Sequence, residues 1–279
     1  MPINTQTLTA DHFEHLKALV EKRAGLSLQD SKRLMVSSRV AKRLRALSIE
    51  DFETYLDFVK SENGKSEYTV LIGVLTTNVT SFFREQHHFD DFRDHVIPCL
   101  KQKAFAGEAV RIWSAGCSIG AEPYSLALLL QKQWPDIESY DVRILATDID
   151  PAVLRQAHEA RYPRELLIKE IPTEYRDQII NQKGEYSTLS ERIRNLVTVK
   201  SLNLVGDWPL QKKFDAVFCR NVVIYFSKEI TRSIWMRFAN QIHEGGRLYV
   251  GHSERVAGPA EAEFRSVGVT VYEKTGRAS

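Results

Sequence analysis

The sequence VRIWSAGCSIGAEPY, which runs from Val110 to Tyr124, decides the fold of this chain. It starts with apolar residues that favour a β-strand, passes through a turn of small residues between Gly116 and Gly120, and leads into a helical run from Ser125 to Gln131. A strand, a glycine turn and a helix in this order place backbone N–H groups and a helix N-terminus beside a nucleotide-like ligand. We therefore expect the ligand-binding half of an α/β sheet here.

A second strand is predicted from Val142 to Ala146, and the sequence Thr147-Asp148-Ile149-Asp150 follows it directly. In a doubly wound sheet, an acidic residue at the end of this strand commonly binds ribose hydroxyls. Asp148 is therefore a candidate ligand-binding residue.

The glycine turn also allows a different interpretation. Gly116, Ser118 and Gly120 match the G-x-S-x-G pattern of a hydrolase nucleophile, and Asp215 and His252 follow in the order of a hydrolase triad. In such hydrolases, however, several strands precede the nucleophile, whereas the sequence before this turn is predicted to be helical. Short motifs also match by chance. A Ser118 hydrolase is thus the weaker alternative, beside a glycine turn that serves packing alone.

The composition is that of an ordinary soluble globular protein. Of 279 residues, 43% are hydrophobic and 27% are charged, and this length accommodates one large or two modest domains. The net charge of +2 gives no reason to expect nucleic acid as a partner. The three cysteines lack metal-ligand spacing, no signal peptide is recognisable, and no apolar run reaches the roughly 18 residues of a membrane span. We expect a cytoplasmic protein with no metal and no direct membrane insertion.

The N-terminal part is predicted to be a bundle of helices, because apolar residues recur there at helical spacing. The expected helices are Asp11–Gly25, Gln29–Leu47, Ser48–Val59 and Glu67–Leu75. The predicted division is a helical domain over residues 1–76, a linker with a first helix over 77–106, and the sheet domain over 107–279. The helix of the linker is expected at Phe89–Lys103, with a kink or break at Pro98. His87 and His88 precede it without other ligands nearby, so we expect polar packing there.

The second predicted helix carries a basic stripe. It has few acidic partners one turn away, which is unusual in a chain of this net charge. A solvated helix face is the alternative, but we favour an acidic protein surface as the target of the stripe. The candidate substrate-binding residues are Arg39, Lys42, Arg43 and Arg45.

After the second strand, a helix is expected at Ala152–Ala160, followed by a small β-rich insertion over residues 162–198. The main sheet then resumes. Its expected elements are strands at Val197–Leu202 and Phe214–Cys219, a helix from Ser227 to about His243 that Gly245-Gly246 stops, and strands at Arg247–Gly251 and Thr270–Lys274.

Five separated motifs occur along the chain, at Thr76–Arg84, Trp113–Ser125, Thr147–Asp150, Phe218–Phe226 and Gly251–Glu254. Together and in this order, they resemble the chemotaxis receptor methyltransferases of the CheR family. The match covers nearly the whole chain, and the motifs are specific because they occur together and in order.

The resemblance implies a function. The expected methyl donor is S-adenosyl-L-methionine, the acceptors are glutamate side chains of chemoreceptor methylation helices, and the products are glutamyl methyl esters and S-adenosylhomocysteine. It implies an N-terminal helical domain before a class I (Rossmann-like) methyltransferase domain with an inserted antiparallel β-subdomain. It also implies a catalytic-centre tyrosine at Tyr225 and cofactor contacts at Asn78, Thr80, Arg84, Glu122, Asp148, Asn203, Leu204, Arg220 and Asn221.

One departure from the family concerns the inserted subdomain. Some members use it to bind a pentapeptide tether at the receptor C-terminus, with a longer glycine-containing loop. The matching stretch here, Asn181–Ser187, is shorter and has one glycine. We therefore expect a tether-independent enzyme, a monomer recruited to membrane receptor arrays. A catalytically silent module of the same fold, which binds receptors or nucleotide only, is the other alternative.

Overall fold

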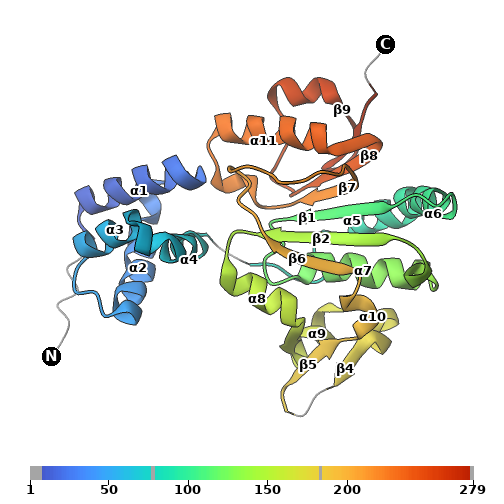
Figure 1. Cartoon of the computed structure of the whole chain (residues 1–279), viewed down its shortest axis with the longest axis horizontal. Coiled ribbons are helices and arrows are strands. Elements are labelled where there is room, and N and C mark those ends of the chain that lie inside the picture. Colours follow the sequence, from blue (N-terminus) through green and yellow to red (C-terminus); the bar gives the residue numbers. More distant parts are fainter. Residues whose placement is uncertain (1–7, 77–78, 182–183, 277–279) are drawn as a thin grey trace.

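A computed structural model describes residues 8–76, 79–181 and 184–276. Residues 10–75 fold into α-helices around a core of their own (Figure 1). On the first helix, Phe13, Leu16 and Val20 are buried, as their helical spacing predicts. The helices are α1 (Ala10–Ala24), α2 (Arg33–Leu47), α3 (Phe52–Lys60) and α4 (Lys65–Leu75), with short 3-10 helices η1 (Asp30–Lys32) and η2 (Glu62–Gly64).

Capping residues set the ends of these helices. Thr9 accepts a hydrogen bond from the backbone N–H of His12 at 3.1 Å, and α1 ends at Gly25 in the left-handed conformation. Ser48 does not begin the third helix, as the sequence had suggested, but ends α2. The start falls later because Asp51 caps α3 by accepting the backbone N–H of Thr54 at 2.8 Å.

The helix predicted over residues 89–103 is interrupted. It consists of α5 (Gln86–Asp91), a π-helical turn η3 (Phe92–Val96) and α6 (Ile97–Phe105), and Pro98 lies in the first turn of α6. A proline has no N–H to donate and its ring crowds the preceding turn, which accounts for the break.

The central sheet has the strand order β6-β2-β1-β7-β8-β10-β9 (Figure 1). β1 pairs in parallel with β2 and β7, whereas β10 is antiparallel to β8 and β9. Alternate residues of β1 face opposite cores, as Ile112 and Trp113 do. The strands are β1 (Val110–Ala115), β2 (Val142–Asp148), β6 (Val197–Ser201), β7 (Phe214–Cys219), β8 (Ile242–Val250), β9 (Phe264–Gly268) and β10 (Val271–Lys274).

Helices pack on both faces of this sheet. α7 (Ala121–Gln133) joins the α5–α6 segment in one core, to which Leu126 and Phe92 contribute. α11 (Lys228–Gln241) supplies Trp235 and Phe238 to the other core. α8 (Pro151–Glu159) lies between the sheet and α4. The arrangement is the α/β fold class that the sequence predicts.

The insertion is a small antiparallel sheet in the order β3-β5-β4, which projects beside α7 and α8 (Figure 1). It precedes β6, so it extends the connection between two strands of the main sheet without disturbing their pairing. Its elements are β3 (Arg161–Pro163), α9 (Arg164–Glu170), β4 (Ile179–Asn181), β5 (Tyr186–Leu189) and α10 (Glu191–Arg194).

The C-terminal part differs from the expectation in two ways. α11 ends at Gln241, and Gly245 and Gly246 lie inside β8 rather than behind a helix. A Cβ atom on Gly246 would lie 2.8 Å from the Asp215 carbonyl oxygen, so the close approach of β7 explains that glycine. β9 had not been predicted at all, and it pairs with β10 through a tight turn.

The helical domain is docked directly on the sheet domain. Leu26 and Phe226 form an isolated β-bridge, and the Ser27 N–H donates to the Tyr225 carbonyl at 2.8 Å. On α4, a Cβ atom on Gly73 would come within 2.2 Å of the Asp150 carboxylate, so only glycine permits this approach. Among the described residues, no helix is long and apolar enough to cross a membrane.

Candidate active site

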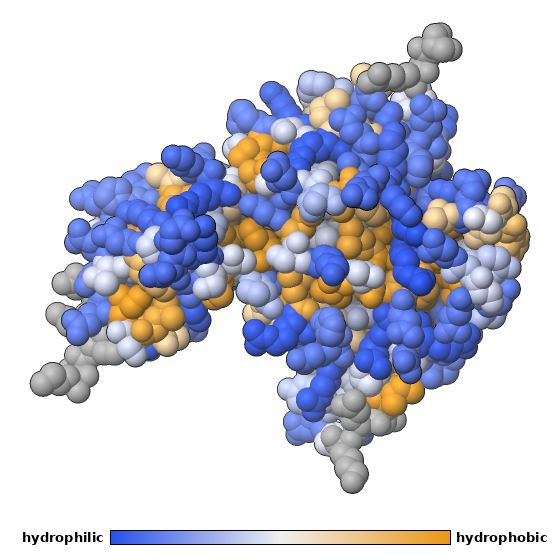
Figure 2. Space-filling model, in the orientation of Figure 1, coloured by the Kyte–Doolittle hydropathy of each residue, from blue (hydrophilic) through white to orange (hydrophobic). Residues whose placement is uncertain are grey.

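A cavity lies at the carboxyl ends of β1, β2 and β7, where open α/β sheets bind their ligands. The helical domain closes one side of it with Leu26, Ile72 and Thr76. Apolar surface is visible where the two domains meet (Figure 2). Asn78 lies outside the described residues; the other predicted cofactor residues all line the cavity, namely Thr80, Arg84, Glu122, Asp148, Asn203, Leu204, Arg220 and Asn221.

Asp148, at the end of β2, is held by backbone groups. Its Oδ2 accepts the Ser118 N–H at 2.8 Å, and its Oδ1 accepts the Asp150 N–H at 3.0 Å. Each oxygen has two lone pairs, so each can accept a further bond from a ligand hydroxyl. Burial raises the pKa of the Asp148 carboxyl, and the backbone N–H groups oppose this rise. The carboxylate is therefore fixed in place with acceptor capacity to spare.

The turn after β1 requires glycine at its first position. Gly116 has a φ of 83°, and a Cβ atom there would lie 2.3 Å from Cγ2 of Val222. A side chain at this position would push apart the loops that follow β1 and β7, which form two walls of the cavity.

The hydrolase alternative is wrong. Asp215 is the second residue of β7 and binds Lys103 and the backbone of Arg111. It lies at the amino ends of the parallel strands, whereas Ser118 follows the carboxyl end of β1. β1 has six residues, so its length of about 17 Å, at about 3.3 Å per residue, separates the two ends of the sheet. His252 contacts Glu85 instead, with 3.3 Å between its Nδ1 and Oε1 of Glu85. The three residues are not brought together.

Arg220 is a buried cation between two carboxylates. Its guanidinium lies 3.2 Å from Glu122 Oε2 and 3.3 Å from Glu85 Oε2, and it also donates to the backbone carbonyl of Arg84. Two carboxylates share this one arginine, so the cluster has excess negative charge. Such a cluster suits a positively charged ligand.

Glu122 comes from the first turn of α7, where the helix N-terminus favours an acidic side chain. The Ser114 hydroxyl donates to its Oε1 at 2.6 Å. Burial raises the pKa of the Glu122 carboxyl, although Arg220 and Ser114 act in the opposite direction. For Glu85, burial is the largest single influence and favours a higher pKa, but Arg220, His88 and the hydrogen bonds with His252 together outweigh it, so the pKa is lowered.

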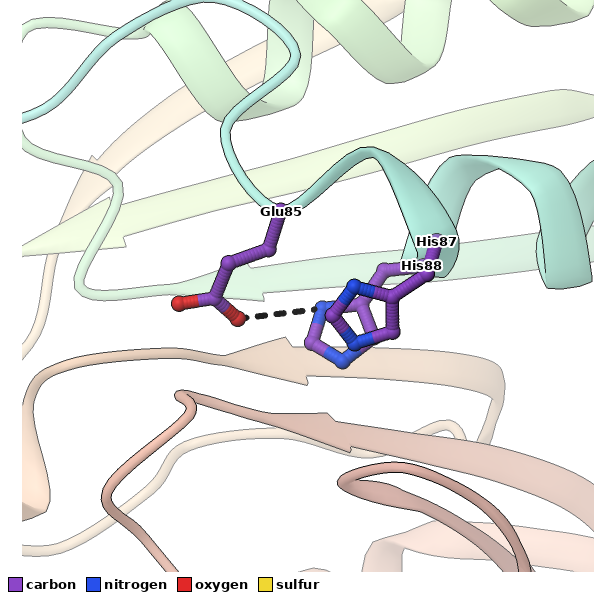
Figure 3. Close-up of side chains that lie close together, drawn as sticks. All are labelled: Glu85, His87 and His88. Carbon is purple, nitrogen blue, oxygen red and sulfur yellow. Dashed lines mark ion pairs between the residues drawn. The ribbon is translucent and has the colours of Figure 1, made fainter.

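Glu85, His87 and His88 bring three potential metal-ligand atoms within 4.8 Å of one another (Figure 3). We interpret the trio as a polar network. His88 Nδ1 lies 3.5 Å from Glu85 Oε2, and its Nε2 lies 2.8 Å from the Thr270 hydroxyl. Burial and the nearby charge of Arg220 lower the pKa of His88 to about 3, so its ring is neutral. The guanidinium beside Glu85 would also repel a metal cation.

The loop after β7 is fixed by one buried carboxylate, Glu254. Its Oε2 accepts the backbone N–H groups of Asn221 and Gly251, at 2.8 and 2.6 Å. Its Oε1 accepts those of Val222 and Val223, both at 2.9 Å. Four donors on one side chain hold the segment that presents Arg220, Asn221 and Tyr225 to the cavity.

Tyr225 ends the short helix η6 (Val223–Tyr225) and lines the cavity. Its carbonyl accepts the bond from Ser27 described above, so both domains fix its backbone. Lys32 Nζ lies 5.7 Å from the centroid of its ring. The tyrosine is therefore placed where a ligand in the cavity meets the helical domain.

The basic stripe divides into two pairs. Arg39 donates to the carbonyls of Val74 and Thr76, at 2.8 and 2.7 Å, and Arg43 forms a bidentate pair with buried Glu67, at 2.9 and 2.6 Å. Both arginines thus tie α2 to α4. Lys42 and Arg45 are exposed, and Arg45 donates to the carbonyl of Ala41 within its own helix.

Sequence reasoning missed three contributors to the site. Glu254 lies in a motif that had been singled out, but nothing assigned it a role. Glu85 follows Arg84 directly, and no pattern indicates its pairing with Arg220. Leu26 follows the end of α1, and only the docking of the two domains brings it to the cavity.

The strand order, the acidic residue at the end of β2 and the adjoining cavity are those of a class I methyltransferase fold. Two family models match the chain: "CheR methyltransferase, all-alpha domain" over residues 11–76, and "CheR methyltransferase, SAM binding domain" over residues 78–273. The chain therefore belongs to the CheR methyltransferase family.

Three relatives show how far the similarity extends. A probable chemotaxis protein methyltransferase of Rhizobium etli is 43% identical over 255 residues, which cover 90% of this chain and 95% of that protein. Chemotaxis protein methyltransferases of Escherichia coli and Borreliella burgdorferi are 36% and 34% identical, and the matches cover 95% and 92% of this chain and 91% and 92% of those proteins. The predicted function, S-adenosylmethionine-dependent methylation in chemotaxis, is confirmed at this level.

Proposed function

We propose that this methyltransferase is a protein-glutamate O-methyltransferase that forms glutamyl 5-O-methyl esters on the methylation helices of chemoreceptors. The observation that carries the proposal is a cavity built by both domains. Carboxylates of the sheet domain line it, and the helical domain closes one side of it. The same helical domain carries the exposed cations Lys42 and Arg45 on its surface. An acidic protein substrate and a cationic donor thus meet surfaces of opposite charge.

The residues of the cavity fit the donor. Asp148 has spare acceptor capacity for two ribose hydroxyls, and Leu26, Leu202 and Leu204 give apolar contact for a base. The excess negative charge around Glu122 and Glu85 suits the ammonium and sulfonium groups. Asn203 and Asn221 add amide groups.

When bound, S-adenosylmethionine supplies a methyl group on a sulfonium, which a carboxylate oxygen accepts while the carbon–sulfur bond breaks and its electron pair stays on sulfur. A glutamate acceptor is already ionised at neutral pH, so no general base and no metal are needed. The chain's own residues orient the two reactants and exclude water. Tyr225, between the cavity and the helical domain, is placed to contact the acceptor carboxylate.

Receptor docking is assigned to the exposed cations of α2. Lys42 and Arg45 project from the helical domain, and acidic residues on a receptor helix complement them. Arg39 and Arg43 act behind them by fixing α2 on α4.

The inserted subdomain is proposed not to bind a receptor tether. Peptide capture by strand addition needs an open, uncharged edge. The connection from β4 to β5 is short. β5 is the central strand, and the two edge strands, β3 and β4, have only three residues each, which leaves little edge for a peptide to extend. We propose a monomeric, cytoplasmic enzyme that reaches receptor arrays through α2. Titration with receptor C-terminal pentapeptides checks this, since saturable micromolar binding would contradict it.

The deciding experiment is a radiolabelled methyl-transfer assay on chemoreceptor cytoplasmic fragments, with base-labile release of methanol to identify an ester. Calorimetry with S-adenosylmethionine and S-adenosylhomocysteine accompanies it. Donor binding without methyl ester on any fragment would favour the silent binding module instead.

A further inference from the structure

Lys32 is a cation of the helical domain that lies beside Tyr225, a residue of the cavity wall. It ends η1 and directly precedes α2. Its Nζ lies 5.7 Å from the centroid of the Tyr225 ring, within the range of a cation–π contact. The chain just before it is fixed on the same tyrosine, because the Ser27 N–H donates to the Tyr225 carbonyl. This backbone contact, five residues before Lys32, holds the segment that carries Lys32 close to Tyr225, which lines the cavity.

The stability of the fold does not explain this lysine. Within the described ranges, no carboxylate lies within ion-pair distance of Lys32, and Asp30 of the same short helix binds Lys17 at 3.3 Å. The first turn of α2 contains no acidic residue, so a positive charge there is not compensated. Lys32 is also half-buried, and partial burial of a charge is unfavourable without a counter-charge.

The other cations of the site are already engaged. Arg220 is buried between Glu85 and Glu122, which neutralise its charge. Arg39 and Arg43 bind groups of the helical domain itself. Arg84 of the sheet domain also lines the cavity and donates to the Val79 carbonyl at 2.9 Å. An anionic acceptor that reaches Tyr225 from the helical-domain side therefore meets the Lys32 ammonium, which no carboxylate of the described residues neutralises.

We propose that the Lys32 ammonium binds the carboxylate of the acceptor side chain beside Tyr225, and so selects an ionised glutamate over its uncharged ester or amide. This inference rests on the proposed function. Methylation removes the negative charge of the acceptor, so the attraction to Lys32 is lost when the ester forms. Lys32 thus favours binding of the substrate and departure of the product.

The test uses a chemoreceptor cytoplasmic fragment that the wild-type protein methylates, and the same fragment with glutamine at the acceptor position. Dissociation constants of both fragments are measured for the wild type and for Lys32→Gln, Lys32→Arg and Lys42→Gln. Donor affinity and the melting temperature of each variant establish that it is folded.

We expect the wild type to prefer the glutamate fragment by about twofold to fivefold, the effect of one accessible charge pair. Lys32→Gln should abolish this preference and Lys32→Arg should retain it, with donor affinity unchanged. Lys42→Gln should weaken the binding of both fragments equally, because Lys42 contributes to docking and not to recognition of the acceptor.

A wild-type preference that survives in Lys32→Gln overturns the inference and leaves the proposed function intact. If the wild type methylates no glutamate in any fragment, the proposed function fails, and the inference fails with it.

Discussion

Oε2 of Glu254 accepts the backbone N–H of Asn221 at 2.8 Å, which fixes the loop after β7 to the loop after β8. Because the carboxylate accepts three further N–H groups, Glu254→Gln would place an NH₂ group opposite two donors. We expect a loss of about 2 kcal/mol of unfolding free energy and weaker donor binding. Urea denaturation and calorimetry measure both. Glu261→Gln, at an exposed carboxylate that caps one N–H, is the control and should change stability by less than about 0.5 kcal/mol.

Asp148→Ala should weaken S-adenosylmethionine binding by about 1–3 kcal/mol, because hydrogen bonds to an ionised group are lost. Calorimetry measures the change. Asp141→Ala is the matched control: exposed Asp141 precedes the other end of β2 and binds half-buried Arg111 at 2.6 Å, far from the cavity. Equal donor affinity in the folded Asp148 variant and the wild type would contradict the assignment.

Tyr225→Phe should lower kcat about tenfold, the effect of one hydrogen bond of about 1.4 kcal/mol, with little change in donor affinity. The ring and its contact with Lys32 are preserved in this variant, so only the hydroxyl is tested. Single-turnover methylation beside donor calorimetry separates the two quantities. A tyrosine that merely packs at the mouth would give equal turnover in both proteins.

The two pairs of the basic stripe should respond differently to substitution. Charge reversal at Lys42 and Arg45 should raise the KM for the receptor and weaken its salt dependence, with unchanged stability, because both side chains are exposed. Arg43→Met should instead destabilise the helical domain by about 3 kcal/mol, because it leaves buried Glu67 without a counter-charge and with only the Tyr55 hydroxyl as a hydrogen-bond donor among the described residues. Receptor titrations at two ionic strengths and thermal denaturation check this, and the reverse pattern would refute the division.

Acid should destabilise the protein through His88. Its folded pKa of about 3 is below the ordinary 6.5, so the unfolded chain binds the extra proton and stability is lost as the pH falls below 6.5. The slope is at most about 1.4 kcal/mol per pH unit for one proton. Urea midpoints between pH 7.5 and 5 measure it. His243 also has a lowered pKa and therefore also destabilises the protein as the pH falls. The contribution of His88 is identified by a smaller change of stability per pH unit in His88→Gln than in the wild type.

The sequence predicted what depends on local order. The turn from Gly116 to Gly120, the carboxylate of Asp148 and the helical periodicity of α1 all follow from neighbours along the chain, and each lies where expected. Boundaries were less predictable where two signals compete. Gly245-Gly246 indicates a helix stop, but the approach of β7 makes the same pair a strand feature.

Pairings between distant residues could not be read from the pattern. Glu85 and Arg220 meet only because the fold brings the start of α5 to the end of β7. Likewise, the one-sided arginines of α2 have the same helical spacing whether they face solvent or an internal partner. Arg43 finds Glu67 on another helix, 24 residues away, and periodicity within α2 carries no information about that.

The β-bridge between Leu26 and Phe226 makes one wall of the donor cavity part of a separately packed core. A ligand that contacts both walls binds only when the two domains are docked, so it stabilises the docked state. The stabilisation is about 2.7 kcal/mol at a ligand concentration one hundred times its Kd. This linkage is reciprocal, so a partner that holds the helical domain and its α2 in place also raises the affinity for the donor. The supply of S-adenosylmethionine in the cell would then govern how firmly α2, the helix proposed to dock on the receptor, is held, and receptor engagement would follow metabolic state.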